Sequence, residues 1–378
     1  MQSQLLLLIP VAVAALWAVQ RYREGAFRRP QPPSAPAPTA PSAAPDEDEP
    51  AWEFRPEDYG LVPDDQLDLH RPGPDPETVW ARQATASGDW RAASALLANS
   101  DPEWRWLRLR SLAAAAAEDD SWVRAWRAAE PGNPNAALVR AMSLVDLAWE
   151  VRGAQRADAT TEEQFAGFHR LLAQAPPAFN EAARLAPADP LPYLGMIQVA
   201  TGLGWPHEHM RHLWSEVTAR AAHHVGAHAV ALQYWCAKWR GSTELMYSFA
   251  ETAAANAPAG SLLPILRLVA RYEELVGQKI DHPGYHTPET TAAIGALLRD
   301  VAVAPLGHAW LPAARHLLVW FLRAQRRFVE AAEQLRLVDG YIGALPWTYA
   351  QDRRALYTAV RKHIVLAEKR LIRESTSD

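Results

Sequence analysis

Six histidines within residues 207–228 are the side chains of this sequence best placed to do chemistry together. Residues three or four positions apart share one face of a helix, so two helices of a hairpin could bring four imidazoles to one metal ion. Glu208 or Glu216 could add a carboxylate ligand or a general base. The spacing differs from the H-E-x-x-H zinc motif, and the alternative is that these residues lie at helix ends and in the intervening turn. The six are His207, His209, His212, His223, His224 and His228.

Cys236, the single cysteine, is the other intrinsically reactive residue. One thiol excludes an internal disulfide and a thiolate zinc site within the chain. The neighbouring Tyr234, Trp235 and Trp239 make an apolar setting. Such a setting favours a buried structural thiol over a nucleophile, because burial disfavours the thiolate.

Sequence motifs for the common enzyme sites are missing. No G-x-x-x-x-G-K-[ST], G-x-G-x-x-G or G-x-S-x-G motif occurs, which removes the usual phosphate, dinucleotide and hydrolase sites. Glu273 and Glu274 are adjacent carboxylates that project from a helix in different directions, and they need no role beyond solvation. We therefore expect no enzyme, and no catalytic residue, metal site or cofactor is predicted. A metal-dependent enzyme using the His207–His228 cluster is the alternative hypothesis.

Aromatic and arginine side chains offer a candidate binding face, with core packing as the usual role of such aromatics. The chain has 16 tryptophans. Trp122 and Trp126, like Trp235 and Trp239, are four residues apart, a spacing at which aromatic side chains usually pack in the core or between helices. Trp and Arg are also frequent hot spots of protein interfaces. The arginines near such aromatics could form a binding face: Arg105, Arg108, Arg124 and Arg127.

The elements that carry these residues begin at recognisable positions. An Asp, Asn or Thr side chain accepts a hydrogen bond from a free N–H of the first helical turn, and a following proline lacks only an N–H that would be unpaired. A capping box is also predicted at Thr160-x-x-Glu163. Five starts of the first kind occur: Asp75-Pro76, Asp101-Pro102, Asn133-Pro134, Asp189-Pro190 and Thr287-Pro288.

Between these starts, apolar residues recur every three or four positions, as in amphipathic helices. Val225 and Ala229 begin one such stripe, and Leu245, Phe249 and Ala253 form another. We expect both stripes to face the core. No stretch alternates β-branched and polar residues, so no sheet is predicted.

The helices recur as units of similar length. Asp101 and Asn133 are 32 residues apart, Asp189 precedes the break near His224 by about 35, and Pro258 follows about 34 later. With segments such as GDWRAASALLA (88–98), this spacing resembles tetratricopeptide repeats, although the Trp-Leu-Gly-Tyr pattern is missing from every unit. The resemblance implies an all-α solenoid of helical hairpins over residues 75–277. Residues 278–378 are expected to continue it with helices at roughly 288–302, 309–325, 328–340 and 349–373.

The segment YWCAKWRGSTELMYSFAETAA (234–254) resembles an uncharacterised bacterial helical family with a Lys-Trp-x-Gly-Ser turn. The resemblance extends over roughly residues 165–270 and implies no particular activity. Gly241 can adopt a left-handed conformation that ends one helix, and Ser242 can cap the next. The signature is therefore explained as a hairpin turn.

The N-terminus carries a charge-free apolar run, Leu5–Val19. About 20 helical residues cross a hydrocarbon core of roughly 30 Å. Arginines at positions 21, 23, 28 and 29 follow the run, and the positive-inside tendency then places the rest of the chain in the cytoplasm. We expect residues 1–22 to be a single-pass membrane anchor. A cleaved signal peptide, with Ala12-Val13-Ala14 as the cleavage motif, is the alternative.

Two further segments precede the helices. Residues 23–50 contain RPQPPSAPAPTAPSAAPDEDEP, a proline-rich stretch that predicts a disordered linker. Residues 51–74 are more apolar, with Trp52, Phe54 and Tyr59 among them. We expect this segment to pack along the domain as an irregular strap, with a partner-binding motif as the alternative.

Composition narrows the class of function. The net charge is −5 and no region is densely basic, which disfavours nucleic-acid binding. The leading hypothesis is a cytoplasmic helical-repeat scaffold, tethered to the membrane, that binds a protein or peptide on its concave side. An exported helical binding protein is a further alternative. The sequence points to no particular partner or oligomeric state.

Overall fold

The computed structural model of this protein describes residues 54–153, 161–258 and 260–376. Within these residues the chain is all-α, and the only β-type pairing is a single bridge between Asp68 and Tyr341. The predicted all-α class is therefore confirmed. The predicted anchor at 1–22 and linker at 23–50 lie outside the described residues. No helix in the described part of the chain is both long and apolar enough to cross a membrane.

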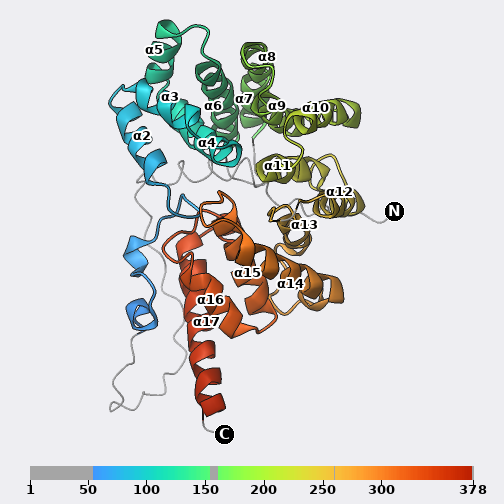
Figure 1. The fold of residues 1–378 in the computed structure, drawn as a ribbon. Coiled ribbons are helices and arrows are strands. Elements are labelled where there is room, and N and C mark those ends of the chain that lie inside the picture. Colours follow the sequence, from blue (N-terminus) through green and yellow to red (C-terminus); the bar gives the residue numbers. More distant parts are fainter. Residues whose placement is uncertain (1–53, 154–160, 259, 377–378) are drawn as a thin grey trace, which may run out of the picture.

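The helices form a curled array that runs from α2 to α17 (Figure 1). In the described part of the chain, short 3-10 turns accompany them at Pro56–Tyr59 (η1), Asp64–Gln66 (η2), Pro283–His286 (η4) and Trp347–Tyr349 (η5). The α-helices are α2 (Pro76–Ala86), α3 (Trp90–Ala98), α4 (Pro102–Glu118), α5 (Ser121–Ala129), α6 (Pro134–Arg152), α7 (Glu162–Leu172), α8 (Ala175–Leu185), α9 (Leu191–Leu203), α10 (His207–Arg220), α11 (Val225–Trp235), α12 (Thr243–Ala255), α13 (Ile265–Leu275), α14 (Pro288–Val303), α15 (Leu311–Ala324), α16 (Phe328–Arg336) and α17 (Arg353–Thr376).

Four of the predicted helix starts are confirmed. In each, the cap side chain accepts a hydrogen bond of 2.9–3.2 Å from a backbone N–H of the first turn. Proline then occupies the first helical position, where no N–H is needed. These caps are Asp75, Asp101, Asn133 and Thr287.

Two predicted starts are displaced by one residue. Helix α9 begins at Leu191 rather than at the proline, and the Asp189 carboxylate accepts from the Leu191 N–H at 3.0 Å. The capping box lies at Thr161 and Gln164 rather than at Thr160 and Glu163. It forms there because the Gln164 amide oxygen accepts from the Thr161 N–H at 2.9 Å while the Thr161 hydroxyl accepts from the Gln164 N–H at 3.2 Å.

Consecutive helices pack as hairpins, for example α9 with α10, α11 with α12 and α15 with α16. Helices α9 and α11 start 34 residues apart, at Leu191 and Val225, close to the predicted spacing. Helix α13 starts only at Ile265, 40 residues after α11, because the predicted boundary at Pro258 lies in a loop. The four predicted C-terminal helices are found as α14 to α17. The third ends earlier than predicted, at Arg336, and the fourth starts later, at Arg353.

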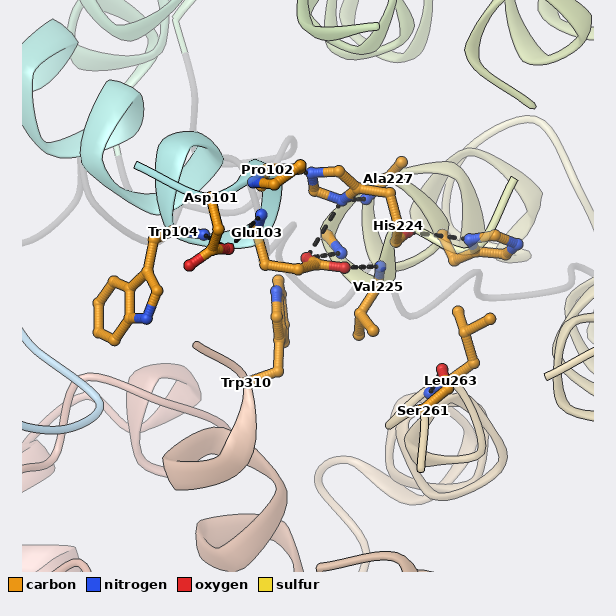
Figure 2. Close-up of polar contacts among 12 residues, drawn as sticks. Asp101, Pro102, Glu103, Trp104, His224, Val225, Ala227, Ser261, Leu263 and Trp310 are labelled. Atoms are coloured by element: carbon orange, nitrogen blue, oxygen red, sulfur yellow. Dashed lines mark hydrogen bonds and ion pairs between the residues drawn. The ribbon is translucent and has the colours of Figure 1, made fainter. Parts of the chain in front are cut away.

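The array closes on itself where α11 meets α4. Helices α4, α6, α9 and α11 pack in sequence, and α11 also packs on α4. At this contact the Glu103 carboxylate accepts from the N–H groups of Val225 and Gly226, at 2.6 and 3.3 Å, so an acidic side chain of α4 caps α11 (Figure 2). In the other direction, His224 Nε2 lies 3.0 Å from the Pro102 carbonyl oxygen and donates to it. The N-termini of α4 and α11 are thus joined, because each supplies a side chain that hydrogen-bonds to the backbone of the other.

Polar side chains fill the inner side of this closed set of helices. Arg110 Nη1 lies 3.1 Å from an Asp146 carboxylate oxygen and donates to the Gln198 side-chain oxygen at 3.1 Å. All three side chains are buried. Burial raises the pKa of Asp146 to about 6, because the cost of desolvating the carboxylate outweighs its attraction to Arg110. Side chains of the chain itself therefore occupy this part of the interior between α4, α6 and α9.

An extended strap, residues 54–75, lies along the C-terminal helices and leads into α2 (Figure 1). Leu61 and Leu67 are buried in the same core as α15 to α17. The fully buried Arg361 guanidinium contacts both Asp339 oxygens at 3.0 and 3.1 Å and also contacts Asp64 of the strap. Asp339 in turn accepts from the Val62 N–H at 2.6 Å. A buried ion pair thus holds the strap in place.

The end of the strap is held by a buried histidine of α15. His316 Nε2 donates to the Pro72 carbonyl oxygen at 3.1 Å, and Nδ1 accepts from the Trp347 indole N–H at 3.0 Å. Both contacts require the neutral imidazole, since Nδ1 must keep its lone pair. Burial lowers the pKa of His316 to about 4. The next residue of the strap, Gly73, lies so close to Pro312 that a side chain at position 73 would clash.

The buried ion pair that holds the strap predicts that Asp339→Asn lowers the free energy of unfolding. The substitution removes the buried negative charge opposite Arg361 and leaves only Asp64, which is half exposed. Breaking a buried pair typically costs about 3–5 kcal/mol, so we expect the free energy of unfolding in urea to fall by about that amount. Asp120→Asn, which breaks the exposed pair with Arg124, is the matched control and should change it by less than about 1 kcal/mol. Equal losses in both variants would contradict the anchoring role.

The buried His316 imidazole predicts that the free energy of unfolding depends on pH. The unfolded chain takes up a proton on this histidine near pH 6.5, whereas the folded chain does so only near pH 4. The free energy of unfolding should therefore fall as the pH drops from 6.5 to 4, by at most about 1.4 kcal/mol per pH unit from this group. His316→Gln should flatten the slope by that amount, and His209→Gln, at an exposed position, should leave it unchanged. Identical slopes in all three proteins would rule out the assignment.

Candidate functional site

An open groove of about 580 Å³ lies between α10, α11 and α12. Its apolar lining includes Trp214, Leu245 and Phe249, with the Trp214 and Phe249 ring centroids 5.2 Å apart. Leu245, which lines the groove with these two rings, is 41% exposed. Helices α10 and α12 are the second helices of two successive hairpins and lie at the margin of the array (Figure 1). The groove is therefore on the outer side of the array rather than its inner one.

The polar lining of the groove carries no carboxylate. Arg211 and the imidazoles of His207, His223 and His228 contribute the titratable groups, and hydroxyl and amide side chains make up the rest. Arg211 and His223 are exposed. The groove thus combines an apolar surface with one fixed positive charge and histidines, which suits an apolar segment that carries acidic residues.

The turn after α11 positions α12 against α10. His207 Nε2 donates to the Arg240 carbonyl oxygen at 2.6 Å, which joins the start of α10 to this turn. Ser242 caps α12 by accepting from the Leu245 N–H at 3.2 Å, as predicted. The left-handed conformation predicted for Gly241 is wrong, since its φ is not positive. Glycine is required there because a side chain would overlap the Trp235 backbone.

Two histidines of the alternative metal-site hypothesis, His224 and His228, are engaged in other contacts. His224 uses both ring nitrogens on backbone groups, accepting from the Ala227 N–H at 3.1 Å and donating to Pro102. His228 donates from Nδ1 to the His224 carbonyl oxygen at 2.9 Å and packs edge-on against Trp214. Its burial lowers its pKa to about 4. Across the described residues, no group of three or more His, Cys, Asp or Glu side chains could hold a metal ion.

Three of the four arginines proposed as a binding face join helices instead, whereas Arg124 pairs with Asp120 at the start of its own helix. Each forms an ion pair within the chain: Arg105 with Asp189 at 2.7 Å, Arg108 with Asp75 and Glu77, Arg124 with Asp120 at 2.5 Å, and Arg127 with Glu181 at 2.8 Å. The nearby Trp122 and Trp126 are buried and stack together. The aromatic pair belongs to the core, and the arginines are already committed to carboxylates.

Two reactive groups lie in the core between α11 and α13. Cys236 is buried, and burial raises the pKa of its thiol well above the usual value, so it stays protonated. The expectation that Glu273 is only solvated is wrong. Its side chain is almost fully buried, pairs with Lys238 at 2.6 Å and accepts hydrogen bonds from Gln233 at 2.6 Å and from the Tyr349 hydroxyl. The neighbouring Glu274, by contrast, is partly exposed and pairs with Arg271.

The sequence contained one signal for the groove. Leu245, Phe249 and Ala253 follow one face of α12, but only Ala253 is buried. The buried face of the helix is formed by Met246, Ala250 and Ala253. The stripe was expected in the core, but its first two residues, Leu245 and Phe249, line the groove instead.

No protein-family model matches this chain, and no curated protein or solved structure matches it either.

Proposed function

We propose that this chain is a cytoplasmic helical-repeat protein, tethered to the membrane by residues 1–22, that binds a partner protein through the outer groove. The hairpins of residues 75–277 are proposed to be degenerate tetratricopeptide-like repeats. The observation that carries the proposal is the exposed Leu245 beside Trp214 and Phe249 in a groove between two helices. Aromatic side chains in such grooves are frequent interface hot spots.

The partner segment follows from the lining of the groove. Its apolar side chains would cover Leu245, Trp214 and Phe249, and its carboxylates would face Arg211. An amphipathic acidic segment has both features, and a helix laid in a groove is a common way of meeting them. The inner side between α4, α6 and α9 is less suited to this role, because the buried Arg110, Asp146 and Gln198 occupy it.

Affinity capture from membranes, with residues 1–50 retained, tests the groove. The double variant Arg211→Glu/Leu245→Glu replaces one positive charge in the groove with a negative one and adds a second negative charge. The partner should therefore be depleted at least about tenfold relative to the wild type in quantitative mass spectrometry. Arg299→Glu/Leu306→Glu is the matched control, since both of its positions are exposed and lie outside the groove. A protein retained by the control but lost by the groove variant supports the proposal. If both double variants capture the same proteins as the wild type, the groove is not the binding site.

N-terminal sequencing of the protein from cells tests the tether separately. An uncleaved chain in the membrane fraction is expected, because the arginines that follow the apolar run favour an anchor with the domain in the cytoplasm. A mature chain that begins near Ala15 would instead support the exported form and contradict the anchor.

A further inference from the structure

The segment that joins α14 to α15 carries the two most exposed large apolar side chains of the described residues. Leu306 is 88% exposed and Val303 is 71% exposed. Single apolar residues on a protein surface are ordinary. These two, however, lie three positions apart in the run AVAPLG (302–307), which contains no charged or hydrogen-bonding side chain. The run, called the apolar loop below, therefore presents an apolar surface to solvent, and such surfaces mark contacts with proteins or membranes.

The backbone of the apolar loop is held in place by hydrogen bonds. The Trp104 indole N–H of α4 donates to the Gly307 carbonyl oxygen at 2.8 Å. On the same side of the loop, the His308 N–H donates to the Pro305 carbonyl oxygen at 2.9 Å. Figure 2 shows the Trp104 side chain directed away from α11. The fold thus fixes the backbone around Leu306 while the side chain of this residue stays in solvent.

The shape and composition of the apolar loop fit a lipid bilayer better than a protein pocket. A side chain as exposed as Leu306 protrudes, so its partner must close around it. Hydrocarbon does so without a preformed cavity, whereas a protein must supply one. The half-buried Trp104 beside the loop is of the residue type enriched at membrane–water interfaces. Arg299 is exposed and shares a helix face with Val303, one turn earlier, where its charge can meet headgroup phosphates.

We propose that the apolar loop inserts into the bilayer to which residues 1–22 tether the chain. This inference rests on the proposed tether. Val303 and Leu306 alone would attach a protein only weakly, since even a whole acyl chain gives marginal membrane binding. A tether makes the second contact intramolecular and so strengthens it. Residues 23–53 can span at most about 100 Å, enough for the loop to reach the bilayer. Insertion then determines which face of the domain meets the membrane.

A fluorescent label beside the apolar loop tests insertion. Gly307 has open space around it and no positive φ, so Gly307→Cys is tolerated. The native Cys236 is buried, so an NBD maleimide labels position 307 of the full chain. In phosphatidylcholine liposomes we expect the NBD emission to shift to shorter wavelength and to be quenched by lipids with a spin-labelled acyl chain. Gly132→Cys, an equally open glycine between α5 and α6, is the matched label position and should stay unquenched.

Substitutions in the apolar loop separate insertion from the tether. Val303→Ser/Leu306→Ser should abolish the shift and the quenching, whereas Arg211→Glu/Leu245→Glu in the outer groove should change neither. Both variants should still float with the liposomes in a density gradient, because residues 1–22 remain.

The outcomes distinguish the loop from the tether. A chain that floats with an unquenched label beside the loop overturns the insertion and leaves the tether intact. A loop whose partner is a protein gives this result. Quenching that persists in Val303→Ser/Leu306→Ser also overturns the insertion. A chain that does not float contradicts the tether and, with it, this inference.

Discussion

The contact between the N-termini of α4 and α11 closes the set of helices formed by α4, α6, α9 and α11. Each helix start leaves backbone N–H groups without partners inside the helix, and two such ends packed together would bury them at a high cost. The Glu103 carboxylate meets this need for α11, since it accepts from two N–H groups at the positive end of the helix dipole. His224 completes the contact by donating to the carbonyl oxygen of Pro102. Closure is stable because both ends supply polar partners.

This closure decides where a partner can bind. An open solenoid offers its concave side to a peptide, but here four helices face one another and bury Arg110, Asp146 and Gln198 between them. The outer groove between α10 and α12 lies away from these buried polar side chains. At the junction with the C-terminal helices, the path of the strap from Asp64 to Pro72 is fixed by the side chains of Arg361 and His316.

The starts of the helices could be predicted from local chemistry, whereas their long-range partners could not. A cap such as Asp101 acts on the next three residues, so it can be recognised in the sequence. Glu103 and Val225 are 122 residues apart, and no local pattern marks their pairing. The same limit explains the errors at Glu273 and Arg108, whose burial depends on distant helices. Leu245 was predicted to be buried because a stripe of apolar residues shows which face of a helix is apolar, but not whether a neighbour covers it.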